Sequence, residues 1–133
     1  MKHRILFIDD EKHISDILKN NLNSNFNFEV TLKCLPSELF QELDANNYDA
    51  ILLDYMIPIE DEFFTPEEIK RMDDGLSTGL VLIERIRSKH PTLPILIYSA
   101  KNNVKTDDYS YYLRKPELAK DIADKLKWLI TKS

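Results

Sequence analysis

The stretch Ile5-Leu6-Phe7-Ile8-Asp9-Asp10 places two carboxylates directly after four apolar residues. Asp54 follows a second apolar run, residues 50–53, and Lys115 comes shortly after a third, residues 111–113. Short apolar runs that end at polar residues are typical of buried parallel strands. The carboxyl ends of such strands meet at one edge of an open α/β sheet, where ligands bind. We therefore expect one pocket to contain Asp9, Asp10, Asp54 and Lys115.

A pocket of three carboxylates favours a particular chemistry. Three carboxylates repel one another and resist ionising together unless a cation lies among them. With the ammonium group of Lys115 beside them, they suit a hard divalent metal ion and a phosphoryl group.

Strand and helix signals alternate along the whole chain. Strands are predicted at residues 5–9, 28–35, 50–54, 95–98 and 110–113. Apolar residues at helical spacing predict helices around residues 14–22, 36–43, 80–90 and 116–129. This alternation predicts a parallel sheet with helices on both faces, in a single domain of residues 1–133.

Charge and composition exclude several classes of function. A net charge of −5 is unfavourable for a broad nucleic-acid surface, so we expect no direct nucleic-acid binding. The apolar runs are too short to cross a membrane, and no signal peptide is evident. Cys34 is the only cysteine, so it has no intramolecular disulfide partner. We therefore expect a cytoplasmic protein.

Four motifs, in order, resemble those of the receiver domain of two-component response regulators, the chemotaxis-type receiver family. They are FIDDE at residues 7–11, LLDYMIP at 52–58, IYSA at 97–100 and LRKP at 113–116. The resemblance implies a flavodoxin-like, doubly wound α/β fold. Its five-stranded parallel sheet would have the order 2-1-3-4-5.

The resemblance also implies a role for each acidic residue of the pocket. Asp54 would accept a phosphoryl group from a histidine kinase or phosphotransfer protein. Asp9 and Asp10 would hold Mg²⁺ together with Asp54 and the main-chain carbonyl of Met56. The domain would then be a phosphoacceptor that assists its own phosphorylation and dephosphorylation, rather than an enzyme with a separate substrate.

Three further residues would sense the phosphoryl group. Lys115 would pair with Asp54 and then with a phosphoryl oxygen, and a cis bond to Pro116 would aim its ammonium group inward. Ser99 would reach the phosphoryl group once Asp54 is modified. Tyr112 would then turn inward as the aromatic switch residue, although Tyr109 and Tyr111 lie close by in the sequence.

The first departure from the family pattern follows the third predicted strand. Residues 55–78 form a connection far longer than the usual βα loop of about 2–6 residues. Within it, residues 59–71 look inserted. Thr65-Pro66-Glu67-Glu68 predicts a capped helix at about 66–72, and Phe63-Phe64 predicts an ordered contact. Residues 72–75, MDDG, are expected to form the turn into the next helix.

The second departure lies between the fourth and fifth predicted strands. Residues 100–110 are polar and have no apolar stripe at helical spacing. The helix that the family has there is therefore expected to be shortened or missing, which changes the usual output surface.

Two classes of function remain open. The first is a phosphorylatable receiver whose downstream partner is unknown, because no effector domain is evident in the sequence. The second is a receiver-like interaction module that does not switch and acts through residues 59–71. A hydrolase that uses Asp54 as its nucleophile would lack a further acid or base.

Overall fold

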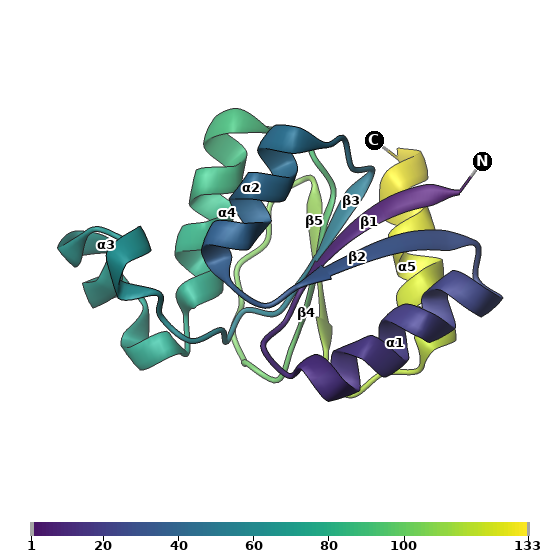
Figure 1. Ribbon diagram of the computed structural model, residues 1–133, viewed down its shortest axis with the longest axis horizontal. Coiled ribbons are helices and arrows are strands. Elements are labelled where there is room, and N and C mark those ends of the chain that lie inside the picture. Colours follow the sequence, from purple (N-terminus) through teal and green to yellow (C-terminus); the bar gives the residue numbers. More distant parts are fainter. Residues whose placement is uncertain (1, 133) are drawn as a thin grey trace.

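A parallel sheet of five strands forms the centre of the computed structural model, which describes residues 2–132 (Figure 1). The strands lie in the order β2-β1-β3-β4-β5 and every neighbouring pair is parallel. This is the order 2-1-3-4-5 that the family resemblance implies. Their bounds are β1 (His3–Ile8), β2 (Phe28–Lys33), β3 (Ala50–Leu53), β4 (Ile95–Ser99) and β5 (Ser110–Arg114).

Two layers of helices cover the sheet (Figure 1). Helices α1 (Lys12–Asn25) and α5 (Ala119–Lys132) pack on one face, and α2 (Pro36–Ala45) and α4 (Thr78–Lys89) pack on the other. Successive strand residues point to opposite faces, so Ile5 and Phe7 of β1 join the first layer while Leu6 and Ile8 join the second. None of the described helices has the length and apolar character needed to cross a bilayer.

The final helix begins later than the sequence predicts. It starts at Ala119, whereas the start was expected at residues 116–117. The backbone N–H of Glu117 donates a hydrogen bond to the Tyr98 hydroxyl (3.0 Å), which holds this residue in the connection rather than in the helix. The bond between Lys115 and Pro116 is cis, as expected.

A loop replaces the helix between β4 and β5, as predicted. Residues 100–109, all within the described part of the chain, contain only turns and irregular structure. Arg87 of α4 binds both carboxylate oxygens of Asp107, at 2.7 and 3.3 Å, and Val104 packs against the core. The loop is therefore fastened to the body at two points.

The long connection after β3 is ordered. It contains two 3-10 turns, η1 (Asp61–Phe63) and η2 (Asp73–Gly75), on either side of a short helix, α3 (Pro66–Arg71). The predicted capping box is present. Thr65 Oγ1 accepts from the backbone N–H of Glu68 (3.1 Å), and Glu68 Oε1 accepts from that of Thr65 (2.9 Å).

The turn predicted at residues 72–75 is present. It forms η2, and Leu76 and Ser77 connect it to α4, which begins at Thr78. The glycine beside the end of β3 is Gly79, whose N–H donates to Tyr55 O (2.8 Å) and whose Cβ, if present, would lie 2.6 Å from the Tyr55 ring. Two glycine-containing turns compete in the sequence, and only this packing distinguishes them. The whole connection of residues 59–77, which contains the segment 59–71 that looks inserted in the sequence, is called the insert below.

The two ends of the insert lie close together. Thr78 Oγ1 donates a hydrogen bond to Ile57 O (2.5 Å), and both residues are buried. The chain thus leaves and re-enters the body at one place.

Arg85 of α4 fastens the insert to the body. It donates to both carboxylate oxygens of Glu68, at 2.9 and 2.6 Å, and to Phe63 O at 3.0 Å. Its guanidinium also lies over the rings of Phe63 and Phe64, at 4.6 and 4.9 Å from their centroids. Such stacking and two-pronged pairing suit arginine rather than lysine.

A second attachment joins the insert to α2. The Glu60 carboxylate accepts hydrogen bonds from Ser37 N (2.9 Å) and Ser37 Oγ (2.6 Å) in the first turn of α2. Phe63 stacks on Phe40 of α2, with ring centroids 5.6 Å apart. The insert therefore braces α2 against α4, although α3 itself projects beyond α4 (Figure 1).

The Arg85–Glu68 contact predicts an acid-sensitive attachment. Hydrogen bonds from Arg85 lower the pKa of Glu68 from 4.5 to about 2. A lowered pKa means that the contact stabilises the fold fully above about pH 4.5 and that this stabilisation is lost as the pH falls towards 2. We expect Glu68→Gln to reduce the free energy of unfolding by about 1–3 kcal/mol at neutral pH.

Urea denaturation at neutral pH and at acid pH measures this difference. Glu67→Gln is the matched control, because Glu67 is exposed on the same helix. The explanation fails if both variants unfold like the parent at neutral pH, or if the loss in Glu68→Gln persists unchanged in acid.

Candidate functional site

The sheet order brings the predicted site residues to one edge. Asp9 directly follows β1, Asp54 follows β3, Ser99 ends β4 and Lys115 follows β5. Main-chain hydrogen bonds continue the strand pairing past these ends, from Asp54 N to Ile8 O (3.0 Å) and from Lys115 N to Ser99 O (3.0 Å). Asp9, Asp54 and Ser99 are each at least 96% buried.

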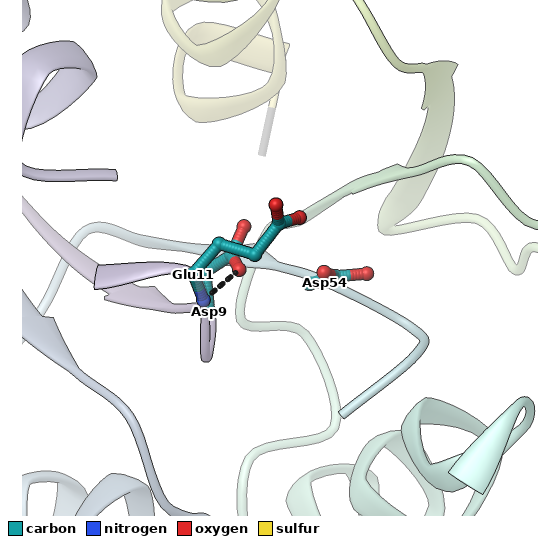
Figure 2. A group of neighbouring side chains, drawn as sticks. All are labelled: Asp9, Glu11 and Asp54. Carbon is teal, nitrogen blue, oxygen red and sulfur yellow. Dashed lines mark hydrogen bonds between the residues drawn. The ribbon is translucent and has the colours of Figure 1, made fainter. Parts of the chain in front are cut away.

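Three carboxylates meet at this edge: those of Asp9, Glu11 and Asp54. Each offers an oxygen within 4.8 Å of the other two. Figure 2 shows the carboxylate of Glu11 extending from the end of β1 towards Asp54. The backbone N–H of Glu11 donates to Asp9 Oδ1 (2.9 Å), which fixes the turn that carries it. Glu11 had no predicted role, although it is the last letter of the FIDDE motif.

Asp10 lies beside this group rather than within it. Its side chain is exposed. It nevertheless lines a cavity of about 190 Å³ together with Glu11, Asp54, Met56, Ala100 and Lys115. Each predicted metal-binding residue except the deeply buried Asp9 therefore borders this cavity.

Lys115 pairs with the acidic group. Its Nζ lies 2.7 Å from Asp9 Oδ2, 3.2 Å from Asp54 Oδ2 and 3.7 Å from Glu11 Oε1. Burial disfavours the charged ammonium, but hydrogen bonds and attraction from Asp9 and Asp54 outweigh it and raise the pKa of Lys115. One ammonium group thus balances only part of the negative charge of the pocket.

The environment of Asp54 favours a cation. Burial raises the pKa of this carboxyl group, and the neighbouring charge of Asp9 acts in the same direction. The backbone N–H of Met56 (3.0 Å to Oδ1) and the ammonium of Lys115 oppose the shift. A buried carboxylate with this balance would gain from further positive charge.

The residues predicted to respond to modification lie next to this pocket. Ser99 Oγ accepts from the backbone N–H of Lys101 (3.3 Å). The Tyr112 hydroxyl donates to Lys101 O and lies 3.4 Å from Ser99 O, while its ring packs against the core under α2 and α4. Tyr111 is instead exposed against Trp128, with ring centroids 5.9 Å apart. Of these two tyrosines, the structure places Tyr112 beside the end of β4.

The donor set fits a magnesium ion. Mg²⁺ prefers oxygen ligands and is commonly held by one or two carboxylates, waters and phosphate oxygens. The grouped oxygens of Asp9, Glu11 and Asp54, with Asp10 on the same cavity, provide such ligands.

Comparison with known proteins gives one consistent answer. The sequence profile of the response regulator receiver domain matches residues 5–127. Response regulator MprA of Mycobacterium sp. (strain KMS) is 27% identical over the whole chain, which spans 53% of that protein. Regulatory protein VanR of Enterococcus faecium is 30% identical over 77% of the chain and 36% of its own length. The chain therefore spans about half or less of these relatives.

Solved structures agree with this result. Response regulator TrrA of Thermotoga maritima, in complex with Mg²⁺-BeF, has a TM-score of 0.71 at 26% identity, over 97% of this chain and 99% of that one. A Francisella response regulator receiver domain has a TM-score of 0.73 at 23% identity, over 98% of each chain. On the profile match, which covers nearly its whole length, the chain belongs to the response regulator receiver domain family.

Proposed function

We propose that this chain is a phosphoacceptor of a two-component or phosphorelay system. Asp54 receives a phosphoryl group from a histidine kinase or phosphotransfer protein in the cytoplasm, and the modified domain controls a downstream partner. The observation that carries this proposal is the placement of Asp54. It is a carboxylate at a strand end, 4% exposed, held 3.2 Å from Lys115 and next to Asp9 and Glu11.

The proposed reaction uses the residues of the pocket directly. A carboxylate oxygen of Asp54 bonds to phosphorus while the bond between phosphorus and the donor breaks, and the donor leaves with the electron pair. Lys115 stays close enough to neutralise charge on the phosphoryl oxygens. Bound Mg²⁺ would supply further positive charge there. Asp9, Asp10, Asp54 and the main-chain carbonyl of Met56 are the residues proposed to hold it.

Ser99 and Tyr112 are proposed to convert modification into a change of shape. Ser99 lies at the end of β4, next to the pocket, and its hydroxyl can turn to a phosphoryl oxygen. Tyr112 is hydrogen-bonded to the main chain of Lys101 in the loop that replaces a helix. A movement of Ser99 would change the surroundings of the Tyr112 hydroxyl, so the loop at 100–109 would respond. Phosphorylation then shifts a population between two states.

An exposed apolar surface beside the pocket is suited to binding the phosphodonor protein. Ile14 and Ile17 of α1 and Leu118 before α5 are 62%, 60% and 71% exposed. They line a cavity of about 610 Å³ that reaches Asp9 and Lys115. Exposed apolar residues grouped in this way are typical of an interaction site. The patch is continuous with the proposed phosphoacceptor pocket, so a protein that reaches Asp54 would cover it.

A second candidate is an interaction module that does not switch and acts through residues 59–71. Its support is the ordered insert, which Arg85 and Glu60 fasten to α4 and α2. The acidic pocket and its lysine favour the phosphoacceptor, because such a pocket serves no purpose in a module that does not switch.

The first test concerns the acceptor. Acetyl phosphate with Mg²⁺ should add one phosphoryl group to the parent protein, seen as a change in intact mass. Asp54→Asn should abolish this addition because the attacking carboxylate is gone. Asp108→Asn, an exposed control outside the pocket, should be labelled like the parent. Labelling that survives Asp54→Asn would show that another carboxylate is the acceptor.

The second test concerns the metal ion. We expect Asp10→Asn to weaken Mg²⁺ binding by about ten-fold or more, because metal sites lose this much when a supporting group is removed. Isothermal titration calorimetry on the unmodified protein measures the affinity, with Asp44→Asn on the far end of α2 as control. An unchanged affinity in Asp10→Asn would remove Asp10 from the metal site.

The third test separates the two candidate functions. Beryllofluoride with Mg²⁺ should shift the amide resonances of residues 99–112 in the parent protein. Lys115→Ala should remain folded and accept a phosphoryl group, but the shift should be largely lost because the ammonium no longer links Asp54 to β5. If beryllofluoride leaves the amide resonances of residues 99–112 unshifted in the parent protein, the result would support the interaction module that does not switch.

A further inference from the structure

Glu11 stands between two cavities. It lines the acidic cavity of about 190 Å³ around Asp54 and also the cavity of about 610 Å³ along α1. Its side chain is 56% exposed, whereas those of Asp9 and Asp54 are 2% and 6% exposed. Of the three grouped carboxylates, Glu11 is therefore the one that an approaching phosphodonor meets first.

The carboxylate of Glu11 is also the most weakly held of the three. Its contact with Lys115 Nζ is 3.7 Å long, compared with 2.7 Å for Asp9 and 3.2 Å for Asp54. The shorter contacts already engage the ammonium group. Lys115 therefore balances the charge of Glu11 less than it balances those of Asp9 and Asp54, and the Glu11 carboxylate faces solvent at the mouth of the pocket.

A phosphoryl group arriving at Asp54 must enter the space that Glu11 borders. The oxygens of Glu11 and Asp54 lie within 4.8 Å of each other, and a transferred phosphoryl group is itself anionic. Two negative charges at such a separation repel, and water and salt weaken the repulsion without removing it. Glu11 can move aside because its side chain is exposed, or a cationic group can neutralise it.

We propose that Glu11 selects the phosphodonor, an inference that rests on the proposed phosphoacceptor role of Asp54. Its charge disfavours free anionic phosphodonors, and a protein donor overcomes this by presenting a basic side chain to Glu11. The apolar residues Ile14, Ile17 and Leu118 line the same large cavity. The matching donor surface is thus an apolar segment that carries a lysine or arginine at the point facing Glu11. Glu11 is a positioning residue here and does not attack phosphorus.

Labelling by acetyl phosphate tests this proposal. A carboxylate oxygen of Asp54 bonds to phosphorus, the bond from phosphorus to the acetate oxygen breaks, and acetate leaves with the electron pair. Rates are measured by intact mass at saturating Mg²⁺, so that any change in metal affinity does not affect them. We expect Glu11→Gln to be labelled about three- to ten-fold faster than the parent at low ionic strength. The difference should shrink as salt is added.

Two control variants complete the experiment. Glu11→Asp keeps the charge and should stay close to the parent rate. Glu29→Gln removes an equal charge from β2, where Glu29 is exposed and lines neither cavity, and should change the rate little. Glu11→Lys should accelerate labelling further than Glu11→Gln.

The outcomes distinguish a failure of this proposal from a failure of the proposed phosphoacceptor role of Asp54. A parent protein labelled on Asp54, with Glu11→Gln no faster at any salt concentration, would overturn the role of Glu11 alone. Acceleration that Glu29→Gln reproduces would also overturn it, because the effect would then be a general one of net charge. A parent protein that acquires no phosphoryl group would overturn the phosphoacceptor role and this inference together.

Discussion

The ammonium group of Lys115 lies between the carboxylates of Asp9 and Asp54, and this contact joins the ends of three strands. The three residues are far apart in the sequence, and the sheet order alone brings them together. Without the lysine, two buried carboxylates would face each other with no opposite charge, which is unfavourable because burial deprives both of hydration. The fold and the chemistry of the site are thus linked: the sheet must place β5 beside β4 for the pocket to be balanced.

In the insert, too, a cationic side chain pairs with a carboxylate and so joins distant segments. Arg85 is paired with Glu68 and stacked on Phe63 and Phe64, so a charged group is held by both polar and apolar contacts. This explains how a long acidic connection can remain ordered. Its phenylalanines extend the core between α2 and α4, and Phe64 is only 6% exposed.

The sequence predicts the fold and the pocket well because their signals are local. An apolar run followed by a carboxylate marks both the strand and the residue at its end, so Asp9 and Asp54 could be placed without a structure. Features that depend on contacts between distant segments are harder to predict from the sequence. Gly75 and Gly79 both suit a turn, for example, and only the contact with Tyr55 shows that Gly79 is the glycine packed beside the end of β3. Glu11 was overlooked for the same reason, since its approach to Asp54 depends on a side-chain direction that no pattern encodes.

The hydrogen bond between Thr78 and Ile57 has a consequence for how this domain could change over evolution. This bond holds the two ends of the insert together. The distance that the connection must span between β3 and α4 is therefore short, whatever the length of the insert. Lengthening an already closed loop is inexpensive, at about 0.6 kcal/mol for each doubling. Exposed residues of α3, such as Glu67 and Lys70, could therefore be replaced without disturbing Asp54. The base of the insert is thus a natural grafting point, where a receiver can acquire a new recognition element while its chemistry stays unchanged.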